Sequence, residues 1–156
     1  MTSEASNRRP THETALRLPD LVGYHLRRAS VFDLQGAVAA LDPTGLRTVP
    51  MSVLLAIVEA PGISSADICR ALGIQRANIV PILTDLDKRG LFLREADPSD
   101  NRVQRLYPTR KGEEEAARAF ALIAAHEDRM LARLSAEERA QLRHLLAKIW
   151  QHDGDG

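Results

Sequence analysis

The chain has 156 residues, 44% of them hydrophobic and 27% charged, which is enough apolar sequence for one domain with a buried core and argues against a disordered protein. Its formal net charge is zero, which argues against a surface adapted uniformly to nucleic acid. A single cysteine, Cys69, excludes an intramolecular disulfide framework and predicts a reducing compartment, the cytoplasm by default. No apolar run has the length of a membrane span, and the first residues lack the apolar segment of a secretory signal.

The neutral total hides an uneven distribution of charge. Residues 64–112 carry nine basic and six acidic side chains, a net charge of +3. Residues 113–156 carry six basic and nine acidic side chains, a net charge of −3. The middle of the chain is therefore the part in which an anionic partner is expected.

Two helices are predicted after an arm, residues 1–19, that is expected to be disordered. Asp20 is a suitable N-cap for a helix that runs to about Leu41, because apolar residues recur there at helical spacing. The second helix, residues 49–59, is apolar almost all round and is predicted to be central and buried. Pro61 and Gly62 end it.

A pair of short helices joined by a glycine comes next. The run from Ser64 to Asp67 has the serine and acid of a helix N-terminus, and the helix it opens is predicted to end near Leu72. Gly73 stands where a helix C-cap requires positive φ. Residues 76–89 form the second predicted helix of this pair, and Gly90 ends it. Its apolar stripe consists of Ile79, Ile82, Leu83 and Leu86. This arrangement is typical of a helix-turn-helix.

Two short strands are predicted directly behind this pair, over residues 91–95 and 103–108. Asp97-Pro98 and Asp100-Asn101 are turn-forming residues between them. A strand pair attached to a helix-turn-helix indicates a winged helix.

Two further helices complete the predicted order. Thr109 caps a long helix that is expected to reach about Leu134. Ser135 and Glu138 form a capping box for the last helix. The apolar side of that helix is large, with Leu142, Leu145, Leu146, Ile149 and Trp150.

The second helix of the pair carries residues suited to reading base edges. Gln75, Arg76, Asn78 and Thr84 lie away from its apolar stripe. Arginine can read guanine, and asparagine or glutamine can read adenine, in a major groove. A solvated polar face on an ordinary helix is the alternative. Pro81 removes a backbone donor, so either the helix starts late or its first turns are kinked.

The turn between the strands offers a second contact. Arg102 stands at or just beyond its tip, where an extended cation can enter a narrow minor groove. Asp100 is expected to hold the guanidinium of Arg102 in place.

The run LGIQRANIVPILTDLDKRGLFLREADPSDNRVQRLYPTRKG resembles the core of MarR-family transcription regulators. The features that match are the leucine–glycine turn, the Arg-Gly end of the reading helix, the Asp-x-Arg of the wing and the Thr-x-x-Gly that follows. The resemblance implies a mainly α fold with a small β-hairpin wing. It implies a DNA-binding lobe over residues 46–109 and a helical dimerisation region from residues 20–45 and 110–152.

The same resemblance implies a homodimer that binds a pseudo-palindromic double-stranded operator as a repressor and is released by a small molecule. Ser64, Ser65 and Arg105 would then hold phosphates. The alternative for the last helix is that its apolar stripe packs within one chain.

Family members typically bind small aromatic or anionic molecules, which directs attention to the first helix. Tyr24, His25, Arg28 and Phe32 lie on neighbouring positions of that helix, and Met51 is the candidate contact from the second helix. An aromatic ring and an arginine can hold an aromatic acid by stacking and bidentate pairing. Similarity to regulators of aromatic catabolism implies acyl thioesters of phenolic acids as a narrower class. A structural role at an interface is the alternative.

Other functional classes have weaker support. A winged helix can serve protein–protein assembly, and Cys69 can serve a redox sensor, although a thiol beside Ile68 and Leu72 is expected to be buried and inert. The five histidines show no metal-ligand spacing, and no phosphate loop or nucleophile-and-base pattern is present. The sequence therefore predicts no enzyme, no metal and no cofactor.

Overall fold

The computed structural model describes residues 17–151 and separates into two compact units, Met1–Phe32 and Asp33–Gly156. Most of the predicted arm, residues 1–16, lies outside the described residues. In the first unit a short 3-10 turn, η1 (Leu18–Asp20), precedes α1 (Val22–Leu41). Because η1 occupies Asp20, the helix starts after this residue and not directly on it. The predicted division into a lobe and a dimerisation region stays a prediction.

The core of the second unit is built around α2 (Thr48–Glu59). Val53, Leu54 and Ile57 have no exposed area, which confirms the prediction of a central, buried helix. Burial of a branched side chain of this size contributes about 1.5–3 kcal/mol. Helices α3, α4 and α5 and strand β3 pack around α2.

The predicted helix pair is confirmed as α3 (Ser65–Leu72) and α4 (Arg76–Lys88). Ser64 and Asp67 form a capping box in which each side chain bonds the backbone N–H of the other residue. Gly73 has φ of 64°, as the C-cap requires. Pro81 lies inside α4, which nevertheless begins at Arg76, so the helix does not start late.

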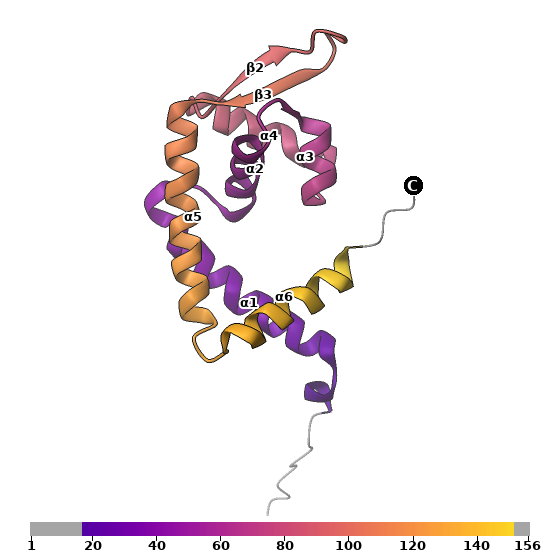
Figure 1. Ribbon diagram of the computed structural model, residues 1–156, viewed down its shortest axis with the longest axis vertical. Helices are drawn as coiled ribbons and strands as arrows, with labels where there is room; N and C mark the ends of the chain where they lie inside the picture. Colours follow the sequence, from indigo (N-terminus) through magenta and orange to yellow (C-terminus); the bar gives the residue numbers. More distant parts are fainter. Residues whose placement is uncertain (1–16, 152–156) are drawn as a thin grey trace, which may run out of the picture. The chain divides into compact units, whose positions relative to one another are not determined.

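A three-stranded antiparallel sheet lies beside these helices, with the order β1 (Ile63–Ser64), β3 (Gln104–Pro108) and β2 (Phe92–Ala96). The two predicted strands, β2 and β3, each start one residue later than expected. Strand β1 was not predicted, because its two residues are too few to show a periodicity. Figure 1 shows β2 and β3 as a hairpin that extends beyond α2, α3 and α4. We call β2, β3 and the turn between them the wing.

Helix α5 (Arg110–Met130) begins directly behind β3 (Figure 1). The Thr109 side chain accepts a hydrogen bond from the Gly112 N–H at 3.0 Å and donates one to the Gly90 carbonyl at 2.8 Å. A Cβ atom on Gly112 would lie 1.9 Å from the Leu91 carbonyl oxygen, so only glycine permits this approach. The Thr-x-x-Gly motif therefore combines a capping threonine, Thr109, with a glycine, Gly112, that lets the backbone of Leu91 come close.

The far part of α5 packs against the second half of α1. His126 is 7% exposed, and its Nε2 lies 3.1 Å from Oδ1 of Asp33. A Cβ atom on Gly36 would lie 2.1 Å from the imidazole Cε1. Glycine at position 36 therefore makes the space that the ring fills.

Helix α5 ends at Met130, four residues before the predicted end, because residues 131–134 form a turn. The last helix, α6 (Ala136–Trp150), begins with the predicted capping box of Ser135 and Glu138. Leu142, Leu145, Ile149 and Trp150 of its apolar side are exposed, with Trp150 at 64%. This side is therefore largely uncovered by the part of the chain that the structure describes.

These elements confirm a mainly α fold with a small β-hairpin wing. Among residues 17–151, no single helix is long and apolar enough to cross a membrane; α1 with the turn after it reaches that length and hydropathy only when counted together with α2 across a bend.

Candidate DNA-binding surface

Helix α4 turns one face to the core and the other to solvent. Ile79, Leu83 and Leu86 are buried, and Ile82 packs partly against the same core. The four residues predicted to meet bases are exposed: Gln75, Arg76, Asn78 and Thr84. The Thr84 hydroxyl donates a hydrogen bond to the Val80 carbonyl at 2.9 Å, so it is already engaged within the helix.

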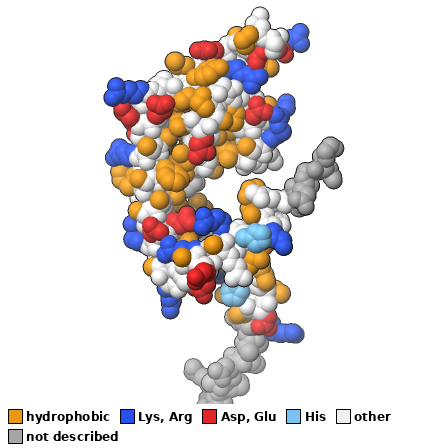
Figure 2. Space-filling model, in the orientation of Figure 1, with side chains coloured by type: hydrophobic (Ala, Val, Ile, Leu, Met, Phe, Trp, Pro, Cys, Tyr) orange, Lys and Arg blue, Asp and Glu red, His pale blue; other side chains and the backbone are white. Residues whose placement is uncertain are grey.

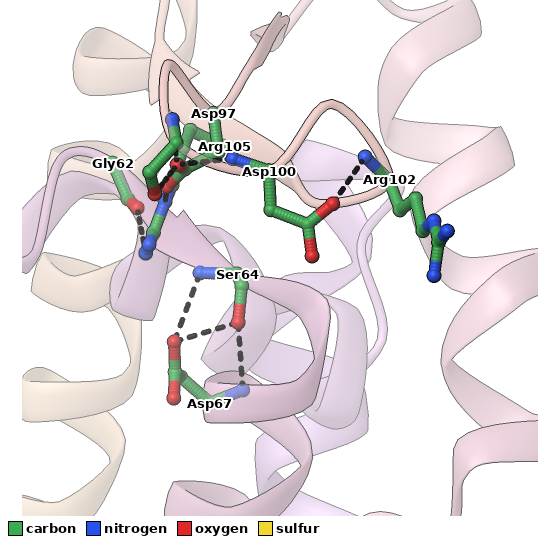
Figure 3. Close-up of polar contacts among 8 residues, drawn as sticks. Gly62, Ser64, Asp67, Asp97, Asp100, Arg102 and Arg105 are labelled. Atoms are coloured by element: carbon green, nitrogen blue, oxygen red, sulfur yellow. Dashed lines mark hydrogen bonds and ion pairs between the residues drawn. The ribbon is translucent and has the colours of Figure 1, made fainter.

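The wing turn is organised by the carboxylate of Asp97, which is 6% exposed. Its Oδ1 accepts hydrogen bonds from the hydroxyl of Ser99 and from the N–H groups of Ser99 at 2.8 Å and Asp100 at 3.2 Å. Its Oδ2 accepts one from Nε of Arg105 at 2.6 Å (Figure 3). Asp97 was predicted only as a turn former. The Asp-x-Ser spacing is typical of an aspartate that bonds the backbone N–H two residues on, so it could have predicted the bond between Asp97 and Ser99.

These bonds favour the ionised carboxylate. The hydroxyl and N–H of Ser99, followed by the guanidinium of Arg105, hold the pKa of Asp97 well below its usual range. The same carboxylate raises the pKa of Arg105. Both groups therefore stay charged across the physiological range, and the turn keeps its internal ion pair.

Arg105 also donates from Nη1 to the Gly62 carbonyl at 3.3 Å. Its guanidinium thus joins the wing turn to the residue before β1, a contact that the sequence did not predict; the phosphate contact expected of Arg105 stays a prediction. We call Asp97, Arg105 and the Gly62 carbonyl the wing base. The register explains the contact, since Arg105 of β3 pairs with Ser64 of β1 and with Glu95 of β2.

Ser64, also predicted to hold a phosphate, is 8% exposed, and its hydroxyl donates to the Asp67 carboxylate at 2.6 Å. This bond from the Ser64 hydroxyl lowers the pKa of Asp67. Ser65, the first residue of α3, is partly exposed and is the serine of this pair that keeps access to solvent.

At the wing tip, residues 99–102, the bonding differs from the prediction. Asp100 Oδ1 accepts a hydrogen bond from the backbone N–H of Arg102 at 3.0 Å and does not bind its guanidinium. Figure 3 shows the Arg102 side chain directed away from Asp100 and from the wing base. The expected contact is wrong because the short aspartate reaches the backbone two residues on, which leaves the longer arginine side chain extended.

The cations around this surface fall into two groups. Arg70 is paired with Asp67, and Arg94 with Asp87 at 3.2 Å. Within residues 17–151, Arg76, Lys88 and Arg102 make no side-chain hydrogen bond or ion pair. On the face shown in Figure 2, basic and acidic side chains are interspersed over the wing and the helices below it. The available positive charge is therefore at particular positions and not spread over a basic face.

The predicted ligand contacts occupy different parts of the chain. In the first unit, the Tyr24 and His25 rings meet edge to face with centroids 5.3 Å apart, and His25 Nε2 lies 2.7 Å from the Pro19 carbonyl oxygen. Arg28 and Phe32 are exposed on the same stretch of α1. Met51 is buried in the core of the second unit. The ligand site stays a prediction.

Cys69 is buried in the core of the second unit, as expected for a structural thiol. No group of three or more His, Cys, Asp or Glu side chains is arranged to hold a metal ion in the part of the chain that the structure describes.

The sequence and the structure of the chain both resemble those of known proteins. Residues 44–102 match the model of the MarR family. The HTH-type transcriptional repressor Rv2887 of Mycobacterium tuberculosis is 33% identical over 129 residues, covering 82% of this chain and 92% of that protein. A crystal structure described as the MarR family protein Rv2887 in complex with p-aminosalicylic acid matches with a TM-score of 0.67.

Two structures of proteins named CouR are also similar. The transcriptional repressor CouR bound to a 23-mer DNA duplex matches with a TM-score of 0.82 and 38% identity, covering 86% of this chain and 96% of that one. CouR from Rhodococcus jostii RHA1 bound to p-coumaroyl-CoA matches with a TM-score of 0.79 and 29% identity, covering 88% and 98%. The chain therefore belongs to the MarR family.

Proposed function

We propose that the protein is a homodimeric repressor that binds a pseudo-palindromic DNA operator and is released by an aromatic acid or its acyl thioester. The outward face of α4 would lie in the major groove, and Arg102 would enter the flanking minor groove. The observation that carries the proposal is the Arg102 guanidinium, extended from the wing tip without a bond to described residues, beside a wing base that is internally paired. An arginine presented in this way is suited to a partner outside the chain.

The dimer is supported by apolar surface on the helices predicted to form it. In α6, Leu145, Ile149 and Trp150 are about half exposed or more. In α1, Val31, Phe32 and Leu34 are exposed to a similar degree. Exposed apolar side chains on each of these helices are typical of an interface, and a second copy would cover them.

The ligand class rests on both the residues and the relatives. Tyr24, His25 and Arg28 offer aromatic surface, a ring nitrogen and a guanidinium on one stretch of α1. The similar CouR is described with p-coumaroyl-CoA and Rv2887 with p-aminosalicylic acid, both of which contain a substituted benzene ring. Release requires that the ligand bind the DNA-competent form less well than another form of the dimer.

The test is fluorescence anisotropy with a labelled duplex from the region upstream of the protein's own gene and a scrambled duplex of the same composition. We expect selective binding whose affinity falls steeply with salt, because phosphate contacts release counterions. Adding p-coumaroyl-CoA or p-aminosalicylic acid should raise the apparent Kd for the operator and leave the scrambled duplex unaffected. Sedimentation of the free protein should give a dimer.

The outcomes separate the parts of the proposal. If the upstream duplex is not bound selectively, selection from a random duplex library follows, and failure to enrich any sequence would contradict the regulator. A bound operator that neither compound releases would contradict the aromatic ligand class alone. A monomer at micromolar concentration would contradict the dimer.

A further inference from the structure

The outward face of α4 has an apolar stripe that includes only one of the four residues predicted to meet bases, Thr84. Its members are spaced three and four positions apart, which places them on one face of a helix. They are Ala77, Val80, Pro81 and Thr84. The helical repeat sets this face opposite the buried Ile79, Leu83 and Leu86.

All four stripe residues are exposed, and Val80 has 62% of its surface accessible. Pro81 has no backbone N–H and presents an apolar ring. The Thr84 hydroxyl donates to the Val80 carbonyl at 2.9 Å, so its methyl group is the apolar part that it adds to the face. The middle of α4 therefore offers apolar contacts where a reading helix commonly offers hydrogen-bond donors.

The major groove contains one apolar group that distinguishes bases, which is the 5-methyl group of thymine. We propose that the stripe of α4 reads thymine methyl groups, so that each operator half-site carries thymine at the one or two positions that face Val80 and Thr84. This inference rests on the proposed DNA-binding function and adds a base preference to it. Arg76 and Asn78, at the start of α4, would read neighbouring positions by hydrogen bonds.

The charges around the stripe favour DNA as its occupant over an apolar protein surface. Arg76 adjoins Ala77 at one end, and Lys88 lies one turn beyond Thr84 at the other. Of the two acids between Thr84 and Lys88, Asp87 is paired with Arg94 and Asp85 is exposed. Neither side chain has an ion-pair partner among residues 17–151. Cations at both ends of an apolar strip complement a groove bounded by phosphates, whereas they would lose solvation without compensation against an apolar protein face.

The experiment uses the full-length protein and a duplex selected by it from a random library. Each thymine of the half-site is replaced in turn by deoxyuridine, in both half-sites together, which removes only the methyl group. We expect one or two positions at which operator affinity falls by about fourfold for each methyl group removed. This factor corresponds to the free energy of burying one methyl-sized apolar group. The remaining positions should show no change.

Two variants assign the effect to the stripe. Val80→Ala and Thr84→Ser each remove apolar contact, and Thr84→Ser keeps the hydroxyl that bonds the Val80 carbonyl. In the variant whose side chain makes the contact, thymine and deoxyuridine should be bound about equally at the sensitive position. Val49→Ala, a matched change at an exposed valine of α2, should retain the full thymine preference.

Each outcome decides between the two proposals. If no position responds to deoxyuridine, or if both variants keep the full thymine preference, the stripe does not read methyl groups and the inference is overturned, although DNA binding stands. If the library yields no selected duplex, the DNA-binding function itself fails. Because Val80 and Thr84 are exposed, loss of folding does not complicate either variant.

Discussion

Arg102 and Arg105 lie three residues apart on one hairpin, and the chain uses them in opposite ways. At the wing base, Arg105 binds the Asp97 carboxylate and the Gly62 carbonyl. At the wing tip, Arg102 is held only through its backbone N–H, which bonds Asp100, and its guanidinium is free of described partners. The same residue type therefore serves the fold in one place and is available to an external anion in the other.

The difference shows that the acceptors within reach decide what an arginine does. Asp97 and Gly62 come from separate segments that the β1–β3 and β2–β3 pairings bring to Arg105. No acceptor from the described chain reaches the guanidinium at the tip. A charged residue at a loop tip is thus a better candidate for recognition than one inside a strand pair.

The largest effect is expected from Asp97→Ala, which removes the acceptor of the wing base. Loss of the bonds from Ser99, Asp100 and Arg105 should lower the Tm by several degrees and release the Arg105 cation. Sequence-selective DNA affinity should fall on the order of tenfold or more, while unselective binding persists through the released cation. Thermal unfolding and anisotropy on operator and scrambled duplexes measure both. Ser99→Ala, which removes one donor, is the graded control, and an unchanged selectivity in Asp97→Ala would show that the carboxylate does not organise the turn.

Arg102→Ala should affect DNA and leave the fold unchanged. Operator affinity is expected to fall about tenfold with a shallower salt dependence, because one cation that meets DNA is lost from each wing. The free energy of unfolding should stay within about 0.5 kcal/mol of the parent, as for other exposed positions. Anisotropy across a salt series and urea unfolding provide the two measurements. If Arg102→Ala and the parent bind the operator with the same affinity at every salt concentration, the proposed role of this side chain is wrong.

The stability that Asp97 gives to the wing base should depend on pH. Because the folded-state pKa of Asp97 lies below its ordinary value of 3.8, its ionised form stabilises the fold fully above that value and progressively less as pH falls below it. The difference in Tm between the parent and Asp97→Asn should be constant near neutral pH and should shrink below about pH 4. Thermal scans of both proteins in matched buffers test this. A difference that grows toward low pH would reverse the assigned sign.

The smallest effect is expected from Asp100→Ala at the tip. Its carboxylate accepts a bond from an exposed backbone N–H, and water can replace that acceptor at little cost. Operator affinity should fall about twofold through looser placement of Arg102, with stability unchanged. The anisotropy assay resolves this if Arg102→Ala is measured beside it. A loss as large as that of Arg102→Ala would mean that the tip is held more tightly than its single bond indicates.

Local signals in the sequence predicted much of the fold. Ser64 with Asp67, Gly73, Thr109 and Ser135 all mark helix ends through contacts within a few residues, and the structure has each of them in that place. The buried face of α4, with Ile79, Leu83 and Leu86, likewise follows from spacing alone. Such features depend on neighbours in sequence, so they can be read without knowing the tertiary structure.

The features of the site that the sequence did not predict depend on distant segments. The contact of Arg105 with Gly62 requires the register of β1, a strand of two residues. Burial of the Ser64 hydroxyl is set by packing, although its capping role was visible in the sequence. The phosphate contacts expected of both residues stay predictions. The fit of His126 against Gly36 joins helices ninety positions apart and has no sequence signal.

The contact of Gly112 with the Leu91 carbonyl has a mechanical consequence. Thr109 bonds Gly90, and Lys111 Nζ donates to the Arg89 carbonyl at 2.7 Å, so the first turn of α5 is fastened to the loop after α4. At about 1.5 Å per residue, α5 is a rod of roughly 30 Å, and a tilt of about 5° moves one end by roughly 2.6 Å relative to the other. Because Gly112 has no free space against Leu91, we expect α5 and the loop after α4 to move together. A tilt of α5 at the end that carries His126 should then displace the wing.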